Sequence, residues 1–188
     1  MLQNKEIILA SKSPRRKEIL EKFGYQVEVV LPYNVDEVNL GQSGFNTPDK
    51  VVCHNSLLKA RSVPASNKPI LASDTIVMLG EKQFGKPEDK KEAISFLTLL
   101  AGKTHQVYSS YSIIHKGQEK TGFDLSHVTF KKLSEKEIMQ YIETVHVLDK
   151  AGAYAIQDGG EIIVEKLEGS FYTVMGLPIE IVTKLLLN

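Results

Sequence analysis

The sequence lacks the features that mark secreted and membrane proteins. Cys53 is the only cysteine in 188 residues, so no disulfide can form within the chain. No stretch approaches the roughly 20 consecutive apolar residues of a membrane helix. The apolar run near the N-terminus, residues 7–10, is too short for the core of a signal peptide. We therefore expect a cytoplasmic protein with no membrane partner.

Charge of one sign is not in excess either. Lys and Arg together number 23, and Asp and Glu together also number 23. Proteins that bind nucleic acid through its phosphates usually carry a basic stripe or patch, and this composition gives no sign of one. We expect no nucleic-acid partner, and any site for an anion must be built locally by a few convergent residues.

Several motifs that mark well-known classes of enzyme are also missing. The chain has neither a P-loop nor a dinucleotide-binding glycine fingerprint. It lacks a G-x-S-x-G nucleophile elbow, so a covalent hydrolase is unsupported. A single cysteine excludes a cysteine zinc cluster, and the five histidines have no metal-ligand spacing: His54, His105, His115, His127 and His146.

The apolar pattern that is present predicts an α/β fold with a central mixed β-sheet flanked by helices. A chain of this length can bury roughly 70% of its unfolded surface, enough for one domain over residues 1–188. Strands are expected at 7–10, 27–31, 70–79 (interrupted at 73–75), 106–114, 122–131 and 161–167. Helices are expected from 14 to 23, 48 to 60, 88 to 101, 134 to 144 and 178 to 187, while 149–157 stays open between helix and loop.

The segment Ser11-Lys12-Ser13-Pro14-Arg15-Arg16 follows a strand and begins a helix, with Ser13 as the expected N-cap. The first N–H groups of a helix attract anions, and arginine matches phosphate oxygens with two hydrogen bonds. This segment is a candidate phosphate cradle. The alternative is a capped surface helix whose basic residues face water.

Asp74 interrupts the most apolar strand of the chain, between Leu71-Ala72 and Ile76-Val77. Aspartate is disfavoured in strands, and burying an unpaired carboxylate costs much free energy. Either the strand ends there, or the charge binds a metal or activates water; a carboxylate that caps a nearby turn is the alternative.

Two weaker candidates complete the set. Asp36-Glu37 follows a strand, and carboxylates from separate loops are ligands that Mg²⁺ takes together with substrate phosphates, although the sequence alone favours an exposed acidic loop. Lysines beside small residues could approach a ligand, although most lysines are solvated: Lys59, Lys86 and Lys150.

These segments together resemble the Maf family of nucleotide pyrophosphatases. The matching stretches occur in the family's order along nearly the whole chain: residues 9–16, 59–60, 72–77, 85–87, 102–108, 128–130, 149–157 and 174–178. The segment 149–157 is similar to the subgroup that acts on dTTP and UTP. The resemblance implies an elongated mixed sheet, two lobes around a substrate cleft, and often a homodimer.

The resemblance also implies roles for particular residues. Asp74 would be the catalytic proton acceptor and, with Glu37, a ligand of a divalent metal, Mg²⁺ or Mn²⁺. The residues that would bind the substrate are Ser11, Arg15, Arg16, Lys59, Thr75, Lys86 and Gln157. Near the segment expected to recognise the base, the chain differs from the family pattern at 145–147, Ala155 and Asp158.

The expected reaction is hydrolysis of a nucleoside triphosphate to the monophosphate and pyrophosphate. Two alternatives stay open at this point. One is a nucleotide-binding regulatory module, because members of this family have been associated with cell division and septum formation. The other is a pyrophosphatase for modified or purine nucleotides.

Overall fold

The computed structural model describes residues 5–42 and 44–187, and the chain divides into two compact units. Unit 1 comprises the described parts of Met1–Thr75, Ser109–Asp124 and Gly176–Asn188. Unit 2 comprises Ile76–Tyr108 and Leu125–Met175. Among the described helices, none is long and apolar enough to cross a membrane.

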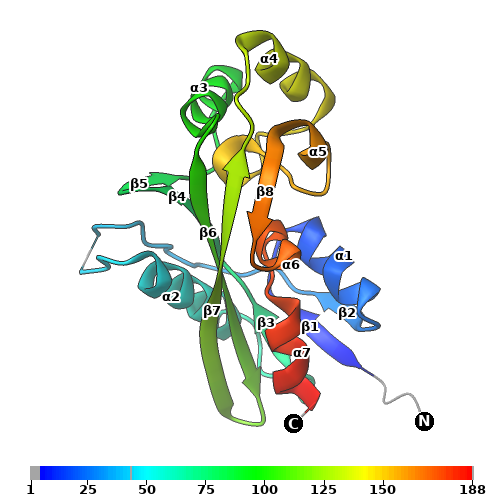
Figure 1. The fold of residues 1–188 in the computed structure, drawn as a ribbon. Coiled ribbons are helices and arrows are strands. Elements are labelled where there is room, and N and C mark those ends of the chain that lie inside the picture. The colour runs from blue at the N-terminus through cyan, green and yellow to red at the C-terminus, as the bar shows by residue number, and fades with distance from the viewer. Residues whose placement is uncertain (1–4, 43, 188) are drawn as a thin grey trace. The chain divides into compact units, whose positions relative to one another are not determined.

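Unit 1 is built on parallel strands. In Figure 1, β1 runs between β2 and β3, and both pairs are parallel. Its elements are β1 (Glu6–Leu9), α1 (Pro14–Lys22), β2 (Gln26–Val29), α2 (Pro48–Arg61), β3 (Ile70–Ala72) and α7 (Ile179–Leu187). The end of β6 (Thr104–His115) and the start of β7 (Gln118–Phe130) also belong to this unit.

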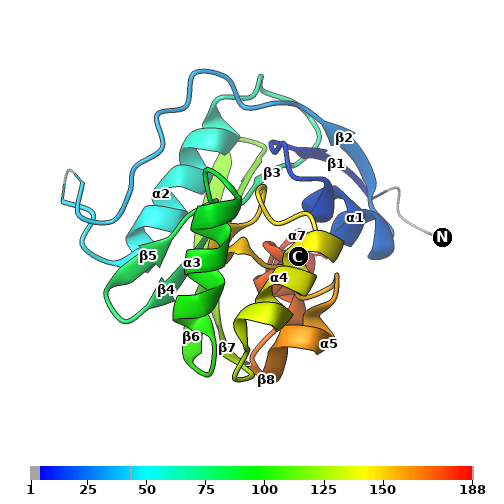
Figure 2. The ribbon, with the colours of Figure 1, turned by 90° about the horizontal axis from the view of Figure 1, so that it is seen from above.

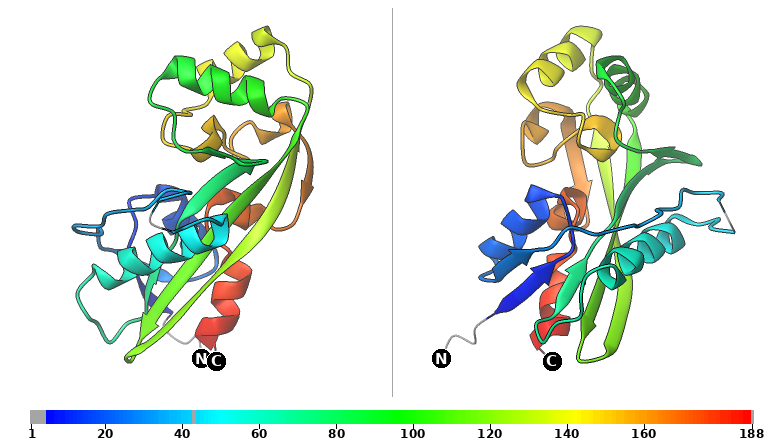
Figure 3. Two further views of the ribbon diagram at one scale, coloured as in Figure 1. Left: turned by 90° about the vertical axis from the view of Figure 1, so that its left-hand side faces the viewer. Right: turned by 180° about the vertical axis from the view of Figure 1, so that it is seen from behind.

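Helices cover both faces of this part of the sheet. Figures 1 and 3 show α2 on one face and α7 on the other. Ile8 and Ile70 pack with Ala60 of α2 in one buried cluster, while Ile7 and Leu9 alternate to the opposite face and are also fully buried. Strands covered on both faces read as continuous apolar runs, which explains why Ile7-Ile8-Leu9 contains no polar residue.

Unit 2 contains the second group of elements. They are β4 (Thr75–Leu79, whose first residue belongs to unit 1), β5 (Lys82–Phe84), α3 (Lys90–Leu100), α4 (Glu135–Thr144), the 3₁₀ turn η1 (Ala151–Ala153), α5 (Gly160–Ile163), β8 (Val164–Glu168) and α6 (Phe171–Met175), with the remaining halves of β6 and β7. Figure 2 shows α3 beside α4. A capping box formed by Ser134 and Glu137 begins α4, in agreement with the helix predicted from 134 to 144.

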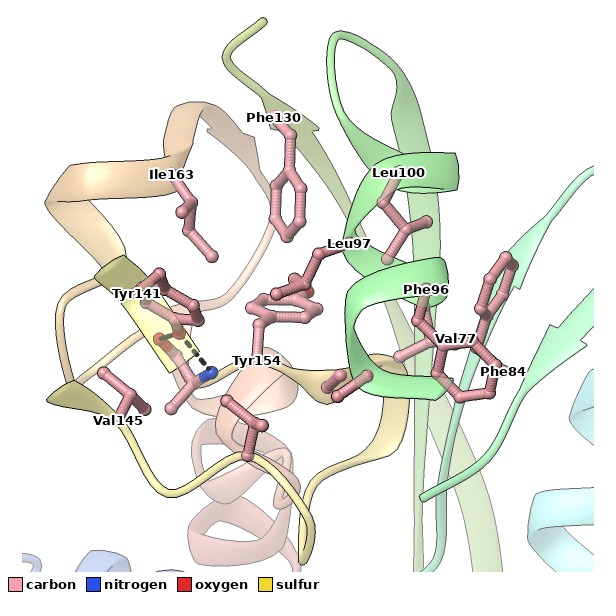
Figure 4. Packing of buried hydrophobic residues seen from close by; sticks show 14 of the residues in the cluster. Val77, Phe84, Phe96, Leu97, Leu100, Phe130, Tyr141, Val145, Tyr154 and Ile163 are labelled. Atoms are coloured by element: carbon pink, nitrogen blue, oxygen red, sulfur yellow. Dashed lines mark hydrogen bonds between the residues drawn. The ribbon is translucent and has the colours of Figure 1, made fainter. Parts of the chain in front are cut away.

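The core of unit 2 is aromatic. Phe130 and Tyr154 meet edge to face at 4.9 Å between ring centroids, and Phe84 meets Phe96 in the same way at 5.1 Å (Figure 4). Tyr141 lies fully buried, and its hydroxyl accepts a hydrogen bond from the Ala155 amide at 3.0 Å. The polar tip of a buried tyrosine is thereby satisfied, and the loop after η1 is fixed against α4.

The eight strands of the described residues form one mixed sheet, which confirms the predicted α/β class. The order is β2-β1-β3-β6-β4-β5, and β7 pairs with β6 and with β8. The β1 pairings are parallel, whereas β3–β6, β4–β5 and β7–β8 are antiparallel. Lys116 and Gly117, both with positive φ, form the turn that joins β6 to β7.

The structure differs from the expectations in three local features. The predicted strand 161–167 begins with the helical turn α5, because Gly159 adopts φ 67° and the turn buries Ile163 in the core. The helix α6 was not predicted. Ser13 precedes α1 as expected but makes no side-chain cap; instead, Ser11 Oγ accepts the Ser13 amide at 3.1 Å.

Candidate active site

Asp74 lies where the strand breaks. β3 ends at Ala72 and β4 begins at Thr75, so Asp74 belongs to neither strand. Ser110 of β6 fills the gap: its amide donates to the Asp74 carbonyl at 2.9 Å, and its hydroxyl accepts the Asp74 amide at 3.1 Å. The strand therefore ends before Asp74, as one interpretation of the sequence expected, and the residue is only 8% exposed.

Helix α2 satisfies this buried carboxylate. Lys59 Nζ donates to Asp74 Oδ1 at 2.8 Å, and Asn55 Nδ2 donates to Asp74 Oδ2 at 3.0 Å. Asn55 and Lys59 are four residues apart, so they lie one turn apart on the same face of the helix. Each carboxylate oxygen thus has a donor, and the charge has a cationic partner.

The Asp36-Glu37 loop joins the same cluster through α2. Glu37 Oε2 lies 2.8 Å from Lys59 Nζ, so a single ammonium contacts both carboxylates. The Glu37 side chain is 50% exposed, whereas that of Asp74 is 11% exposed. One acidic group of the pair therefore faces solvent and the other is enclosed.

Arg16 connects the start of α1 to this cluster. Its Nη1 donates to Ser11 Oγ at 3.2 Å, its Nη2 to Thr75 Oγ1 at 3.2 Å, and its Nε to the Gly176 carbonyl at 2.9 Å. Burial lowers the pKa of the guanidinium, and the negative charges of Asp74 and Glu37 act in the opposite direction. Arg16 therefore ties three chain segments together beside the two carboxylates.

Gly176 must be a glycine for this arrangement. Its φ is 112°, and a Cβ there would lie 3.3 Å from Thr75 Oγ1 and 3.6 Å from Arg16 Nε. Its carbonyl also accepts the Ser73 hydroxyl at 2.8 Å. A side chain at this position would be strained and would press on the groups that hold the strand break.

The structure brings together most of the residues singled out from the sequence. Unit 1 contains Ser11, Arg15, Arg16, Glu37, Lys59, Asp74 and Thr75. Two lie in unit 2: Lys86 is exposed, and Gln157 is half-buried and donates to Asp158 Oδ2 at 3.0 Å. The Gly152 amide donates to the Gly85 carbonyl at 3.0 Å, so the segments that carry these two residues meet within unit 2.

The sequence reasoning missed Asn55, Ser110 and the role of Gly176. Asn55 and Ser56 occupy the buried side of α2, where Val51, Val52 and Ala60 are apolar. Polar residues on the apolar side of a predicted helix were the signal in the sequence that could have pointed to them, since a buried side-chain amide needs hydrogen-bond partners. Their partners are distant in sequence, so the pattern alone could not name them.

Asp74 and Glu37 can hold a divalent cation only if substrate phosphates supply further ligands. Among the residues that the structure describes, no group of three or more His, Cys, Asp or Glu could hold a metal ion. Mg²⁺, however, is often bound by one or two carboxylates together with substrate phosphates. Asp74 and Glu37 supply two hard oxygen ligands that converge on one cation, the Lys59 ammonium.

Comparisons with known proteins agree with this fold. The Staphylococcus aureus Ham1 protein has the same fold, with a TM-score of 0.53, 15% sequence identity, and coverage of 97% of this chain and 98% of that one. The chain belongs to the family described as Maf-like protein, which matches residues 6–188.

Curated relatives in this family are named dTTP/UTP pyrophosphatase. One from Bacillus cereus (strain ATCC 10987 / NRS 248) is 44% identical over 93% of this chain and 85% of its own length. One from Bacillus anthracis is 42% identical over 93% of this chain and 91% of its own length. The resemblance to the Maf family and to this subgroup is thus confirmed.

Proposed function

We propose that this protein is a nucleotide pyrophosphatase that hydrolyses dTTP and UTP to the monophosphate and pyrophosphate. The observation that carries the proposal is a buried carboxylate, Asp74, held beside a basic helix start in a chain whose curated relatives are named dTTP/UTP pyrophosphatase. Regulatory binding without turnover has no comparable support.

The chemistry begins at Asp74. Its carboxylate accepts a proton from a water molecule whose oxygen attacks the α-phosphorus of the substrate. The bond between the α-phosphorus and the bridging oxygen then breaks, and pyrophosphate leaves with the electron pair. A positioned general base of this kind typically contributes 10²–10⁴-fold to the rate.

The positive groups stabilise the phosphates. The amides at the start of α1 and the Arg15 side chain lie on one segment, and Arg16 retains N–H donors beyond the three that it uses within the protein. Lys59 and Lys86 add charge. Such preorganised stabilisation is usually the largest catalytic contribution.

The proposal includes a divalent metal, Mg²⁺ or Mn²⁺, held by Asp74 and Glu37. When bound, such an ion supplies positive charge against the negative charge that develops on the phosphates. A metal ion bound there would take the place of Lys59 as the counter-ion of Asp74 and Glu37, so the Lys59 ammonium could then contact a phosphate. Thr75 and Gln157 take part in substrate choice, the latter by pairing with the edge of the base.

Pyrophosphate release across a panel of nucleotides tests the function. The panel contains dTTP, UTP, CTP, ATP, GTP and 7-methyl-GTP, each with Mg²⁺ and with Mn²⁺. We expect release from dTTP and UTP at least about 10-fold faster than from the rest, since unpaired polar groups penalise the wrong base. Equal or faster release from purine nucleotides would indicate the purine alternative, and nucleotide binding without release the regulatory one.

A further inference from the structure

Asn55 uses both N–H donors and the carbonyl oxygen of its side chain on the two acidic segments of the site. The residue is 3% exposed. Its Oδ1 accepts the Val38 amide at 2.9 Å, and its Nδ2 donates to the Val38 carbonyl at 3.0 Å. The second N–H of the same nitrogen donates to Asp74 Oδ2 at 3.0 Å. One short side chain therefore joins the residue after Glu37 to the carboxylate of Asp74.

Lys59 makes a second link between the same two segments, one turn further along α2. Its ammonium contacts Glu37 Oε2 and Asp74 Oδ1, each at 2.8 Å. The two links differ in character. Lysine is a charge on a flexible stem, and its contacts can be exchanged for others when a substrate binds. Asparagine has few rotatable bonds, and here its contacts are to backbone as well as to Asp74.

We propose that Asn55 is a positioning residue for the reaction, which fixes the Asp74 carboxylate relative to the loop that carries Glu37. This inference rests on the proposed function. The Nδ2 donor holds Oδ2 of Asp74 in one orientation and leaves the other carboxylate oxygen for Lys59 and the reactants. The clamp on Val38 holds the backbone next to Glu37, so both carboxylates keep their places when Lys59 changes partner.

Three substitutions separate positioning from simple structural support. Asn55→Leu keeps the branched shape of the side chain, with methyl groups in place of the amide oxygen and nitrogen, and removes all three hydrogen bonds. Asn55→Asp keeps an acceptor for the Val38 amide but replaces the donor to Asp74 with a like charge. Ser56→Ala is the matched control, because Ser56 is buried on the same helix and bonds to the Cys53 carbonyl and Ser112 Oγ.

Steady-state kinetics with dTTP is the first measurement, with thermal unfolding of each variant alongside. Asn55→Leu and Asn55→Asp should each lower kcat by about 10- to 100-fold, the scale of a misplacement near 1 Å, while KM changes by less than about 3-fold. Ser56→Ala should keep the wild-type kcat even with a comparable loss of thermal stability. If Asn55→Leu does not fold, Asn55→Asp decides on the same criterion.

Hydrogen exchange at the Val38 amide is the second measurement and does not depend on activity. Exchange should be fast in Asn55→Leu and slow in the wild type, Asn55→Asp and Ser56→Ala. A wild-type kcat in either Asn55 variant would overturn the proposal. A wild-type enzyme inactive on the nucleotide panel would refute the proposed function instead. In that case, unchanged Val38 exchange in Asn55→Leu would refute the positioning as well, and faster exchange would support it.

Discussion

At the scale of single residues, the site depends on how one buried carboxylate is paired. Asp74 has a cation on one oxygen and an amide donor on the other. Removing one partner of such a buried pair is expected to cost far more free energy than the pair contributes, because the remaining charge is left uncompensated. Loss of Lys59 would also leave the carboxylates of Asp74 and Glu37 facing each other without their shared cation.

His105 is a second buried polar residue, and it lies in the core of unit 2. Its Nε2 is 2.9 Å from the Tyr154 hydroxyl, and its ring packs edge to face on Phe130. Its Nδ1 has no hydrogen-bond partner among the residues that the structure describes. Burial lowers the pKa of His105 to about 4, so the folded protein keeps this imidazole neutral over the physiological range.

This pKa predicts a loss of stability in mild acid. The unfolded chain binds a proton at His105 below pH about 6.5, whereas the folded protein does so only below about 4. The contribution of neutral His105 to the free energy of unfolding is therefore complete at neutral pH. It is lost as the pH falls from about 6.5 to about 4, by about 3 kcal/mol in total. Urea unfolding across this range measures it.

The matched variant for that measurement is His105→Gln, which keeps hydrogen-bonding atoms and cannot titrate. We expect the free energy of unfolding of the wild type to fall more steeply with decreasing pH than that of the variant. Parallel curves for the two proteins would mean that His105 does not carry the pH dependence.

At the scale of helices and strands, the sequence predicts those elements whose signals are local. Thr47-Pro48 marks the start of α2, Ser134 and Glu137 that of α4, and Lys116-Gly117 the turn between β6 and β7. Cap chemistry, turn chemistry and apolar spacing act within a few residues, so a single sequence displays them.

The elements that the sequence did not predict depend on distant partners. The turn α5 forms because Ile163 fits the core beside Tyr141 and Phe130, although the residues 161–167 alternate like a strand. The same limit applies to the site. Asp74 stands out by its apolar neighbours, but nothing near Asn55 in sequence shows that its amide meets Asp74 or Val38.

The capping box of α4 allows a test at this scale. Ser134 Oγ accepts the Glu137 amide, and Glu137 Oε2 accepts the Ser134 amide at 2.7 Å. Ser134→Ala should lower the free energy of unfolding by about 1 kcal/mol, because it removes one side-chain cap of an exposed helix start. Chemical denaturation measures this, and dTTP turnover at neutral pH should stay unchanged.

A control substitution on the same helix is Gln140→Ala, on the solvent side, which should change stability by less than about 0.5 kcal/mol. Equal effects of the two substitutions would argue that the capping box contributes nothing beyond ordinary surface contacts.

At the scale of the whole molecule, the positive and negative charges balance, so binding of an anion depends on a few positioned cations. The formal net charge is zero, so attraction of a polyphosphate depends on the few cations around Asp74 and at the start of α1. The proposed reaction needs those charges on the phosphates and the acidic pair beside them. Unit 1 supplies both through three connections: α2 to Asp74, Arg16 to Gly176, and Ser110 to the strand break.

The most direct test of the account follows the oxygen of the attacking water. Wild type and Asp74→Asn would hydrolyse dTTP in ¹⁸O-labelled water, with mass spectrometry of both products. For the wild type we predict label in dTMP and none in pyrophosphate, since water attacks the α-phosphorus. Asp74→Asn should fold and react at least about 100-fold more slowly, the lower range for a lost general base. Label in pyrophosphate, or wild-type turnover by Asp74→Asn, would contradict the account.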